Sequence, residues 1–157
     1  MTQGARHCEF GRYLEDFEIG AVHRHWPGKT ITESDNNLFC LLTMNHHPVH
    51  LDEHYAAGQQ HGRILVVGTL VLSLAVGMTV RDISGRAIAN LGYDAVRHLA
   101  PVFVQDTIYA STRVIDVTPS RSKPDRGVIT VFTTAENQRR EPVLEFSRRV
   151  LVPKRHA

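Results

Sequence analysis

Cysteine is scarce in this sequence, with only Cys8 and Cys40 among 157 residues. Small secreted folds usually depend on several disulfides, so a disulfide-braced class is excluded and a reducing compartment is favoured. The first residues also lack the basic and apolar pattern of a signal peptide. We therefore expect a cytoplasmic protein.

Long apolar runs and a strong net charge are lacking as well. The longest apolar run, residues 64–78, is shorter than the roughly 20 residues that span a bilayer, so we expect no membrane segment. The formal net charge is only +2, from 18 basic and 16 acidic residues, which gives no basis for a nucleic-acid surface. Hydrophobic residues make up 42% of the chain, enough for the core of one globular domain.

The pattern of apolar residues predicts a short flexible segment over residues 1–12 and one domain over residues 13–157. In chain order it predicts a strand over 22–31 broken near 26–28, helices over 34–43, 52–58 and 68–80, and strands over 87–96, 107–115, 127–134 and 142–152. This order is typical of an α+β fold in which an antiparallel sheet wraps around a central buried helix.

The helix over 68–80 is apolar almost all round, which predicts that it is buried. Thr69, Ser73 and Gly77 recur every four residues along it and form one stripe of small side chains. We expect this stripe to let the sheet approach the helix closely.

Histidine is concentrated in one place. His46, His47, His50 and His54 fall within nine residues of the chain. His50 and His54 are four apart and could share a helix face as metal ligands do, but no cysteine or third ligand is near and Pro48 separates them from the other two. We therefore expect no metal, and proton transfer is the chemistry that an imidazole offers near neutral pH.

The segment from Thr43 to His50, read with Asp52 and Tyr55-Ala56, resembles the signature of the MaoC-like, R-specific enoyl-CoA hydratase family. The family pattern has glycine, aspartate and asparagine where this chain has Met44, Asn45 and His47. Further segments that resemble the family are Phe17-Glu18-Ile19-Gly20, Gly62-Arg63, Gly68-Thr69-Leu70, Arg97, Pro101-Val102-Phe103 and Asp106-Thr107. The resemblance covers residues 17–152 and extends, in its Thr-Met-Asn signature, to hydratases of itaconyl-CoA or mesaconyl-CoA.

This resemblance implies a single hot-dog domain that acts as a hydro-lyase on a 2-enoyl-CoA thioester. It implies that His50 transfers the proton and that the backbone amide of Gly68 forms the oxyanion hole. Because the family's histidine works with an aspartate at the position of Asn45, we expect His50 to act nearly alone here, or with His47 or Asp52 in support. Asn45 stands where the family has a carboxylate, and a neutral amide can orient water but cannot take its proton. We further expect Arg63 and Thr69 to bind substrate, Arg63 through a second carboxylate if there is one.

Two other functions remain open at this point. A hot-dog acyl-CoA thioesterase could use Asn45 to position water, and the missing aspartate would suit a non-catalytic acyl-CoA binding protein. We expect no cofactor beyond the CoA of the substrate. Two hot-dog domains usually associate in this family, which implies a homodimer or larger homo-oligomer. For the CoA phosphates, the basic loop over residues 121–126 offers candidates by composition alone.

Overall fold

A computed structural model describes residues 10–155. Most of the flexible segment expected at the N-terminus lies outside the described residues. Gly11, near the end of this expected segment, is hydrogen-bonded to η3 (Val80–Ser84): its N–H donates to the carbonyl oxygen of Arg81 at 3.0 Å.

Five antiparallel strands form one twisted sheet in the order β1-β3-β4-β5-β2. The strands are β1 (Val22–Thr30), β2 (Ala89–His98), β3 (Thr107–Pro119), β4 (Arg126–Glu136) and β5 (Pro142–Pro153). In β4 every second residue is buried, the alternation that a sheet with one face on a core requires. The pairing of β1 with β3 shifts register between His25 and Lys29, which confirms the break expected near residues 26–28.

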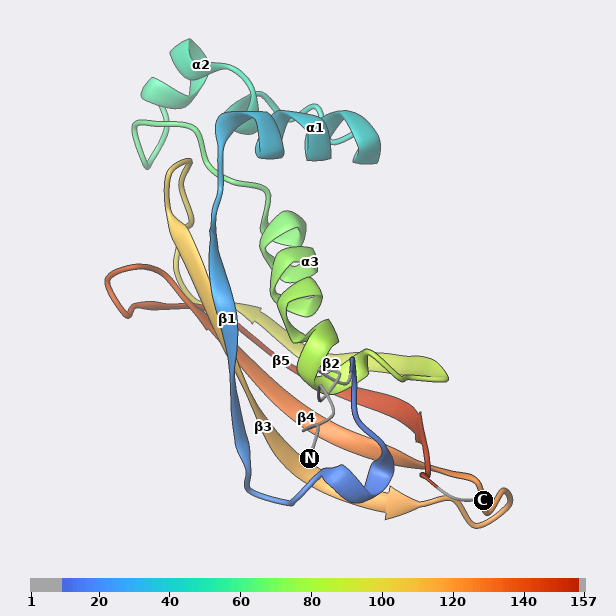
Figure 1. Cartoon of the computed structure of the whole chain (residues 1–157). Coiled ribbons are helices and arrows are strands. Elements are labelled where there is room, and N and C mark those ends of the chain that lie inside the picture. Colours follow the sequence, from blue (N-terminus) through green and yellow to red (C-terminus); the bar gives the residue numbers. More distant parts are fainter. Residues whose placement is uncertain (1–9, 156–157) are drawn as a thin grey trace, which may run out of the picture.

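The helices gather on one face of the sheet and beyond its end. The long helix α3 (Gly68–Thr79) lies across the sheet, and α1 (Glu33–Thr43) and α2 (Glu53–Ala57) lie above its N-terminal end (Figure 1). Short helical turns η1 (Leu14–Asp16) and η2 (Pro48–His50) and the π-helical η3 (Val80–Ser84) complete the described chain. This is the predicted α+β arrangement, and the α1, α2, α3 and strand predictions are confirmed. No helix in residues 10–155 is long and apolar enough to cross a membrane.

The caps of α1 follow from its sequence. The Thr32 hydroxyl accepts from the Asp35 N–H, and the Asp35 carboxylate accepts from the Thr32 N–H at 2.8 Å, so the two residues form a capping box. At the other end Met44 adopts the left-handed conformation, with φ 59° and ψ 22°, and its N–H donates to the Cys40 carbonyl. This is the conformation that usually selects glycine.

The small-residue stripe of α3 does not face the sheet, so that prediction was wrong. Thr69, Ser73 and Gly77 are exposed, and the face buried against the sheet carries Val71 and Ala75, with Thr79 in line with them. The two sets are offset by two residues, or about 200° around a helix, and therefore lie on opposite faces. In a single chain α3 is consequently covered on one side only, although its sequence is apolar almost all round.

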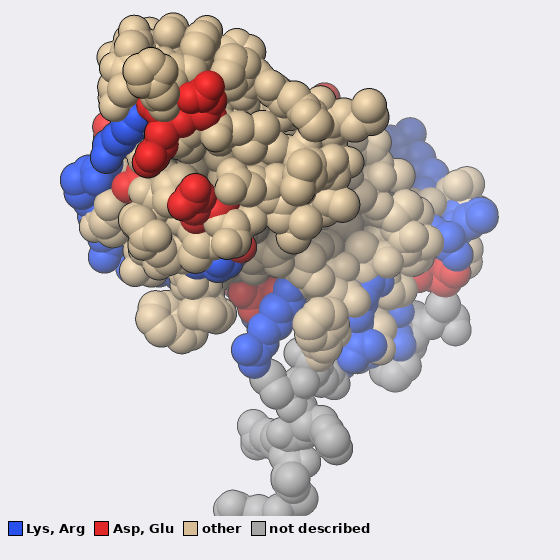
Figure 2. Space-filling model, turned by 90° about the horizontal axis from the view of Figure 1, so that it is seen from above, with Lys and Arg blue, Asp and Glu red and all other residues tan. Residues whose placement is uncertain are grey.

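The leucines of α1 are uncovered too. Leu38, Leu41 and Leu42, which mark this helix in the sequence, are 57%, 64% and 74% exposed. The buried face of α1 carries Asn36 and Cys40 instead. Seen from above, the region of α1 and α2 shows a broad uncharged surface with acidic side chains gathered toward one side (Figure 2).

A polar chain anchors η3 to the sheet. The buried ring of His25 contacts Asp82 Oδ2 through Nδ1 at 2.9 Å and the Thr112 hydroxyl through Nε2 at 2.8 Å. Thr112 in turn contacts the Thr133 hydroxyl at 2.8 Å. Buried polar groups that are all partnered in this way fix neighbouring elements in register, here β1, β3, β4 and η3.

Candidate active site

His50 lies in η2 with one ring nitrogen committed to the backbone. Its Nδ1 is 2.7 Å from the carbonyl oxygen of Leu65. A carbonyl can only accept, so Nδ1 carries the proton and Nε2 of the neutral ring is left as the basic nitrogen. The Leu65 N–H donates back to the Val49 carbonyl at 3.1 Å, which ties the His50 turn to the segment that leads into α3.

Asn36 completes this connection and was missed in the sequence. Its side chain is fully buried; Nδ2 donates to the His50 carbonyl at 3.0 Å, and Oδ1 accepts from the Val67 N–H at 3.0 Å. One amide group therefore bridges the backbone of the proposed base to the residue before Gly68. The available signal was a helix-disfavouring asparagine four residues before the apolar Cys40, on the same face of α1.

The N-terminal end of α3 is open. No side chain caps this helix, and the N–H groups of Gly68 and Thr69 make no hydrogen bond to an acceptor in residues 10–155. Unpaired amides at a helix start carry partial positive charge and suit an oxygen that gains negative charge. The structure thus brings His50 and the Gly68 turn together through Asn36 and Leu65.

Asn45 and His47 are held in the turn before η2. Asn45 Oδ1 accepts from the His47 N–H at 3.4 Å, a long contact, and His47 Nδ1 accepts from the Val49 N–H at 3.1 Å. The His47 ring lies 6.0 Å from the His50 ring and 6.2 Å from the Tyr55 ring, between centroids. Both residues thus shape the backbone around His50, and no contact joins the Asn45 amide to the His50 ring among the described residues.

Arg63 lies in the loop between α2 and α3, and Thr69 lies at the start of α3. The guanidinium of Arg63 stacks over the Phe103 ring, 3.6 Å from its centroid, in cation–π geometry. Phe103 belongs to a tight turn that the Asp106 carboxylate closes by accepting the Phe103 N–H at 2.9 Å. Arg63 is therefore placed by a defined aromatic platform, and Thr69 is exposed on the first turn of α3.

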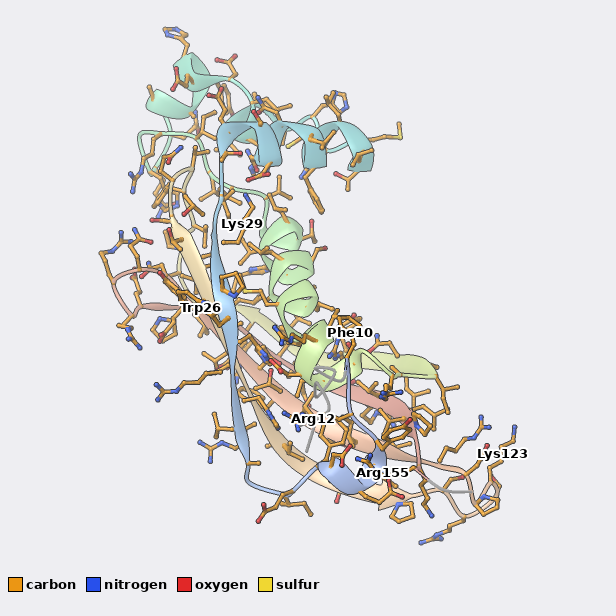
Figure 3. All side chains as sticks on the ribbon, viewed as in Figure 1. Phe10, Arg12, Trp26, Lys29, Lys123 and Arg155 are labelled. Atoms are coloured by element: carbon orange, nitrogen blue, oxygen red, sulfur yellow. The ribbon has the colours of Figure 1, made fainter. Side chains whose placement is uncertain are left out.

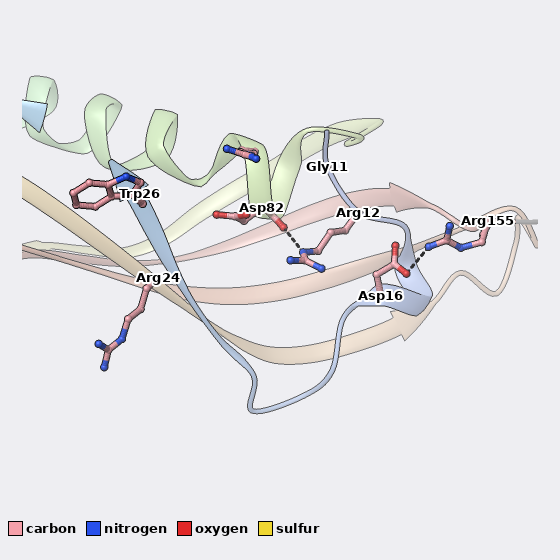
Figure 4. A pocket seen from close by; sticks show the side chains of 8 residues that line it. Gly11, Arg12, Asp16, Arg24, Trp26, Asp82 and Arg155 are labelled. Carbon is pink, nitrogen blue, oxygen red and sulfur yellow. Dashed lines mark hydrogen bonds and ion pairs between the residues drawn. The ribbon is translucent and has the colours of Figure 1, made fainter. Parts of the chain in front are cut away.

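The basic loop over 121–126 lies elsewhere. Lys123 stands at the end of the sheet opposite α1 and α2 (Figure 3), so this loop is remote from His50. A charged cavity of about 420 Å³ also lies away from Gly68, beyond the C-terminal end of α3, where Arg155 pairs with Asp16 at 2.6 Å and Arg12 Nε donates to the Asp82 carbonyl at 3.1 Å (Figure 4). Neither feature contributes to the site around His50.

No group of three or more His, Cys, Asp or Glu side chains in the described chain is arranged to hold a metal ion. Cys40 is a free, fully buried thiol, and burial raises its pKa above the ordinary value. A thiol in this state is a poor nucleophile.

Comparison with known proteins matches residues 16–137 to the family model described as MaoC like domain. The chain is 34% identical over 145 residues to a mesaconyl-CoA hydratase of Cereibacter sphaeroides, covering 92% of this chain and 42% of that protein. A solved structure of a putative MaoC domain protein dehydratase from Chloroflexus aurantiacus is 35% identical, with a TM-score of 0.88, over 92% of this chain and 41% of that one.

A third similar protein, a conserved hypothetical protein of Mycobacterium tuberculosis with a double hot-dog fold, has a TM-score of 0.82 at 26% identity, over 92% of this chain and 44% of that chain. The expected hot-dog fold is thereby confirmed. The chain spans about two fifths of the length of the first curated relatives it matches.

Proposed function

Because this chain belongs to the MaoC-like domain family, we propose that it adds water to, or removes it from, the 2,3 bond of an enoyl-CoA thioester. The observation that carries the proposal is the bridge between His50 and the start of α3. Nδ1 of His50 is fixed on the Leu65 carbonyl, and Asn36 joins His50 to Val67. The His50 base and the two N–H groups at the start of α3 that have no acceptor in the described chain, joined through Asn36, are the two parts that hydration requires.

In the hydration direction, Nε2 of His50 takes a proton from water as the water oxygen bonds to C3 of the substrate. The electron pair of the 2,3 bond moves through C2 to the thioester oxygen, which the Gly68 N–H stabilises. The resulting enolate then takes a proton at C2 from the imidazolium of His50, so the enzyme returns to its starting state. Asn45 and His47 assist by holding the η2 turn, and the Asn45 amide orients the water.

The proposed substrate class is a branched or dicarboxylic enoyl-CoA. It is supported by the similarity to a mesaconyl-CoA hydratase and to a beta-methylmalyl-CoA dehydratase, at 34% and 35% identity. Arg63, placed on the Phe103 ring, is the group that binds the second carboxylate, and Thr69 contacts the acyl group from α3. The reaction needs no cofactor beyond the CoA of the substrate, and the proposed setting is the cytoplasm.

A second hot-dog unit is the proposed partner, supplied by another copy of the chain. The outer face of α3 and the leucines of α1 are uncovered in one chain, and β2 forms an edge of the sheet with Leu91, Tyr93 and Val96 exposed. An exposed edge strand with apolar side chains is a surface that proteins normally cover. The double hot-dog relative, of which this chain spans 44%, supports pairing of two such units.

Turnover assays with crotonyl-, mesaconyl- and itaconyl-CoA test the function. Loss of the enoyl thioester absorbance reports hydration, and a thiol reagent reports hydrolysis in the same cuvette. We expect hydration of at least one substrate without thiol release, and His50→Ala should lower kcat by about 10²- to 10⁴-fold, the usual contribution of general acid–base catalysis. His54→Ala, an exposed histidine on α2, is the matched control. Thiol release would make the protein a thioesterase, and tight binding without turnover would make it a binding protein; either result contradicts the proposal.

A further inference from the structure

His98 lies against Gly68, at the open end of α3. It is the last residue of β2, opposite Leu144 of β5, and its side chain is exposed. A Cβ atom built on Gly68 would lie 2.9 Å from Cε1 of His98, 3.1 Å from Nε2 and 3.3 Å from Nδ1. The edge of the ring that carries both nitrogens therefore faces the Cα of Gly68.

This contact is compatible with glycine at residue 68. The backbone of Gly68 has no left-handed conformation that would demand glycine, whereas a Cβ at this position would require the His98 ring to shift. The imidazole reaches into the space that a Cβ would need, so the ring lies against the first turn of α3.

Both neighbours in this contact have unused hydrogen-bonding groups. Neither ring nitrogen of His98 has a hydrogen-bond partner among residues 10–155, and the Gly68 N–H has none either. The His98 side chain is exposed, so a molecule in front of the helix can reach the ring. An imidazole always carries at least one N–H donor. Two donors, one on β2 and one on α3, thus lie next to each other at the start of α3.

We propose that His98 is a second donor of the oxyanion hole, giving a hydrogen bond to the thioester oxygen beside the Gly68 N–H. The proposal rests on the proposed function and deepens it by assigning a further catalytic residue. The thioester oxygen gains the electron pair of the 2,3 bond when water adds at C3, and the His98 proton stays on the ring throughout. Donors fixed before the reaction stabilise such a developing charge more effectively than water does.

The replacement of a carboxylate by Asn45 fits this role. A carboxylate near the thioester would oppose the negative charge on its oxygen, whereas the neutral amide does not. A second donor on the thioester oxygen lowers the barrier by polarising the thioester.

The test compares His98→Phe, which keeps a ring but has no N–H, with His98→Gln, which keeps an N–H donor. The His54→Phe variant on α2 is the control. On the enoyl-CoA that the wild type hydrates best, we expect His98→Phe to lower kcat by about 10²-fold, the loss typical of one oxyanion-hole donor, with little change in KM. His98→Gln should recover most of this loss, and His54→Phe should match the wild type.

A second readout does not need turnover. Butyryl-CoA labelled with ¹³C at the thioester carbonyl is bound to each variant, and the carbonyl stretch is measured by difference infrared spectroscopy. The stretch should lie at lower frequency on the wild type and on His98→Gln than on His98→Phe. If the wild type is active but His98→Phe has the same kcat and the same carbonyl stretch as the wild type, the role of His98 is overturned and the proposed function is not affected. A wild type that hydrates no enoyl-CoA would overturn the proposed function, while the infrared shift would still decide the His98 contact.

Discussion

Replacing Asn36 by aspartate tests the bridge between His50 and α3. Asn36 is fully buried, and its two polar atoms contact the His50 carbonyl and the Val67 N–H, each at 3.0 Å. Aspartate has nearly the same shape and can still accept from Val67. It cannot donate to the His50 carbonyl unless it is protonated, so the substitution cuts one of the two links.

The expected losses of stability and of kcat in Asn36→Asp follow from these contacts. A buried carbonyl that loses its donor costs about 1–3 kcal/mol, and the carboxylate oxygen that faces it adds repulsion and a desolvation cost. We expect the free energy of unfolding of Asn36→Asp to fall by about 2–4 kcal/mol at pH 8. Since misplacement of a catalytic group by about 1 Å can cost 10²-fold in rate, kcat should fall by roughly 10- to 100-fold.

The pH dependence gives this variant a signature of its own. Burial against a carbonyl raises the pKa of the new carboxyl in the folded state above its unfolded value. The folded protein then binds the extra proton more readily, so the penalty is present at high pH and is relieved as pH falls through the raised pKa. Protonated, the side chain can again donate to His50.

Urea unfolding followed by circular dichroism at pH 8 and pH 5.5, with enoyl-CoA turnover, measures both effects. Asn37→Asp is the control, because Asn37 is the next residue of α1 and its side chain makes no hydrogen bond in the described chain. If Asn36→Asp matched the control in stability at both pH values and kept full kcat, Asn36 would not hold His50 to the start of α3.

Three further substitutions probe the surroundings. Met44→Gly should stabilise the protein by about 1 kcal/mol, because φ of 59° is strained for methionine and free for glycine; an unchanged or lower urea midpoint would speak against this. The ammonium of Lys29 and the Thr32 N–H lower the pKa of Asp35 to about 2; its contribution is therefore present above about pH 4 and lost as pH falls through about 2, and Asp35→Asn should flatten the acid unfolding curve over that window. Gly68→Ala should lower the melting temperature, because its Cβ would approach the His98 ring to 2.9 Å. The drop in melting temperature of the double variant Gly68→Ala with His98→Ala should be smaller than the sum of the two single drops. Strictly additive drops would show that the ring moves away without cost.

Much of the fold could be predicted because its local signals agree. The helix after Thr32 has a capping box, the strands carry alternating apolar residues, and residues 68–79 are too apolar to lie anywhere but against the sheet. Which face of α3 packs against the sheet could not be predicted. The stripe of Thr69, Ser73 and Gly77 and the opposite stripe from Val71 share the same spacing, and only the tertiary packing decides between them.

The candidate site divides in the same way. The resemblance of the signature led to His50, and the helix start at Gly68 follows from the apolar pattern. Asn36 and His98 could not be found, because their roles depend on contacts across 31 and 30 residues of chain, to Val67 and Gly68, that no local pattern encodes. The left-handed turn at Met44 persists without glycine because the Met44 N–H is held by the Cys40 carbonyl at the end of α1.

A crystal structure with bound butyryl-CoA, which is saturated and cannot be hydrated, would show directly how His50 and Gly68 meet the substrate. We expect the thioester oxygen within hydrogen-bonding distance of the Gly68 N–H, with Nε2 of His50 facing C3 of the acyl chain. A thioester bound away from the first turn of α3, or a His50 ring whose Nε2 faces solvent in the complex, would contradict this arrangement.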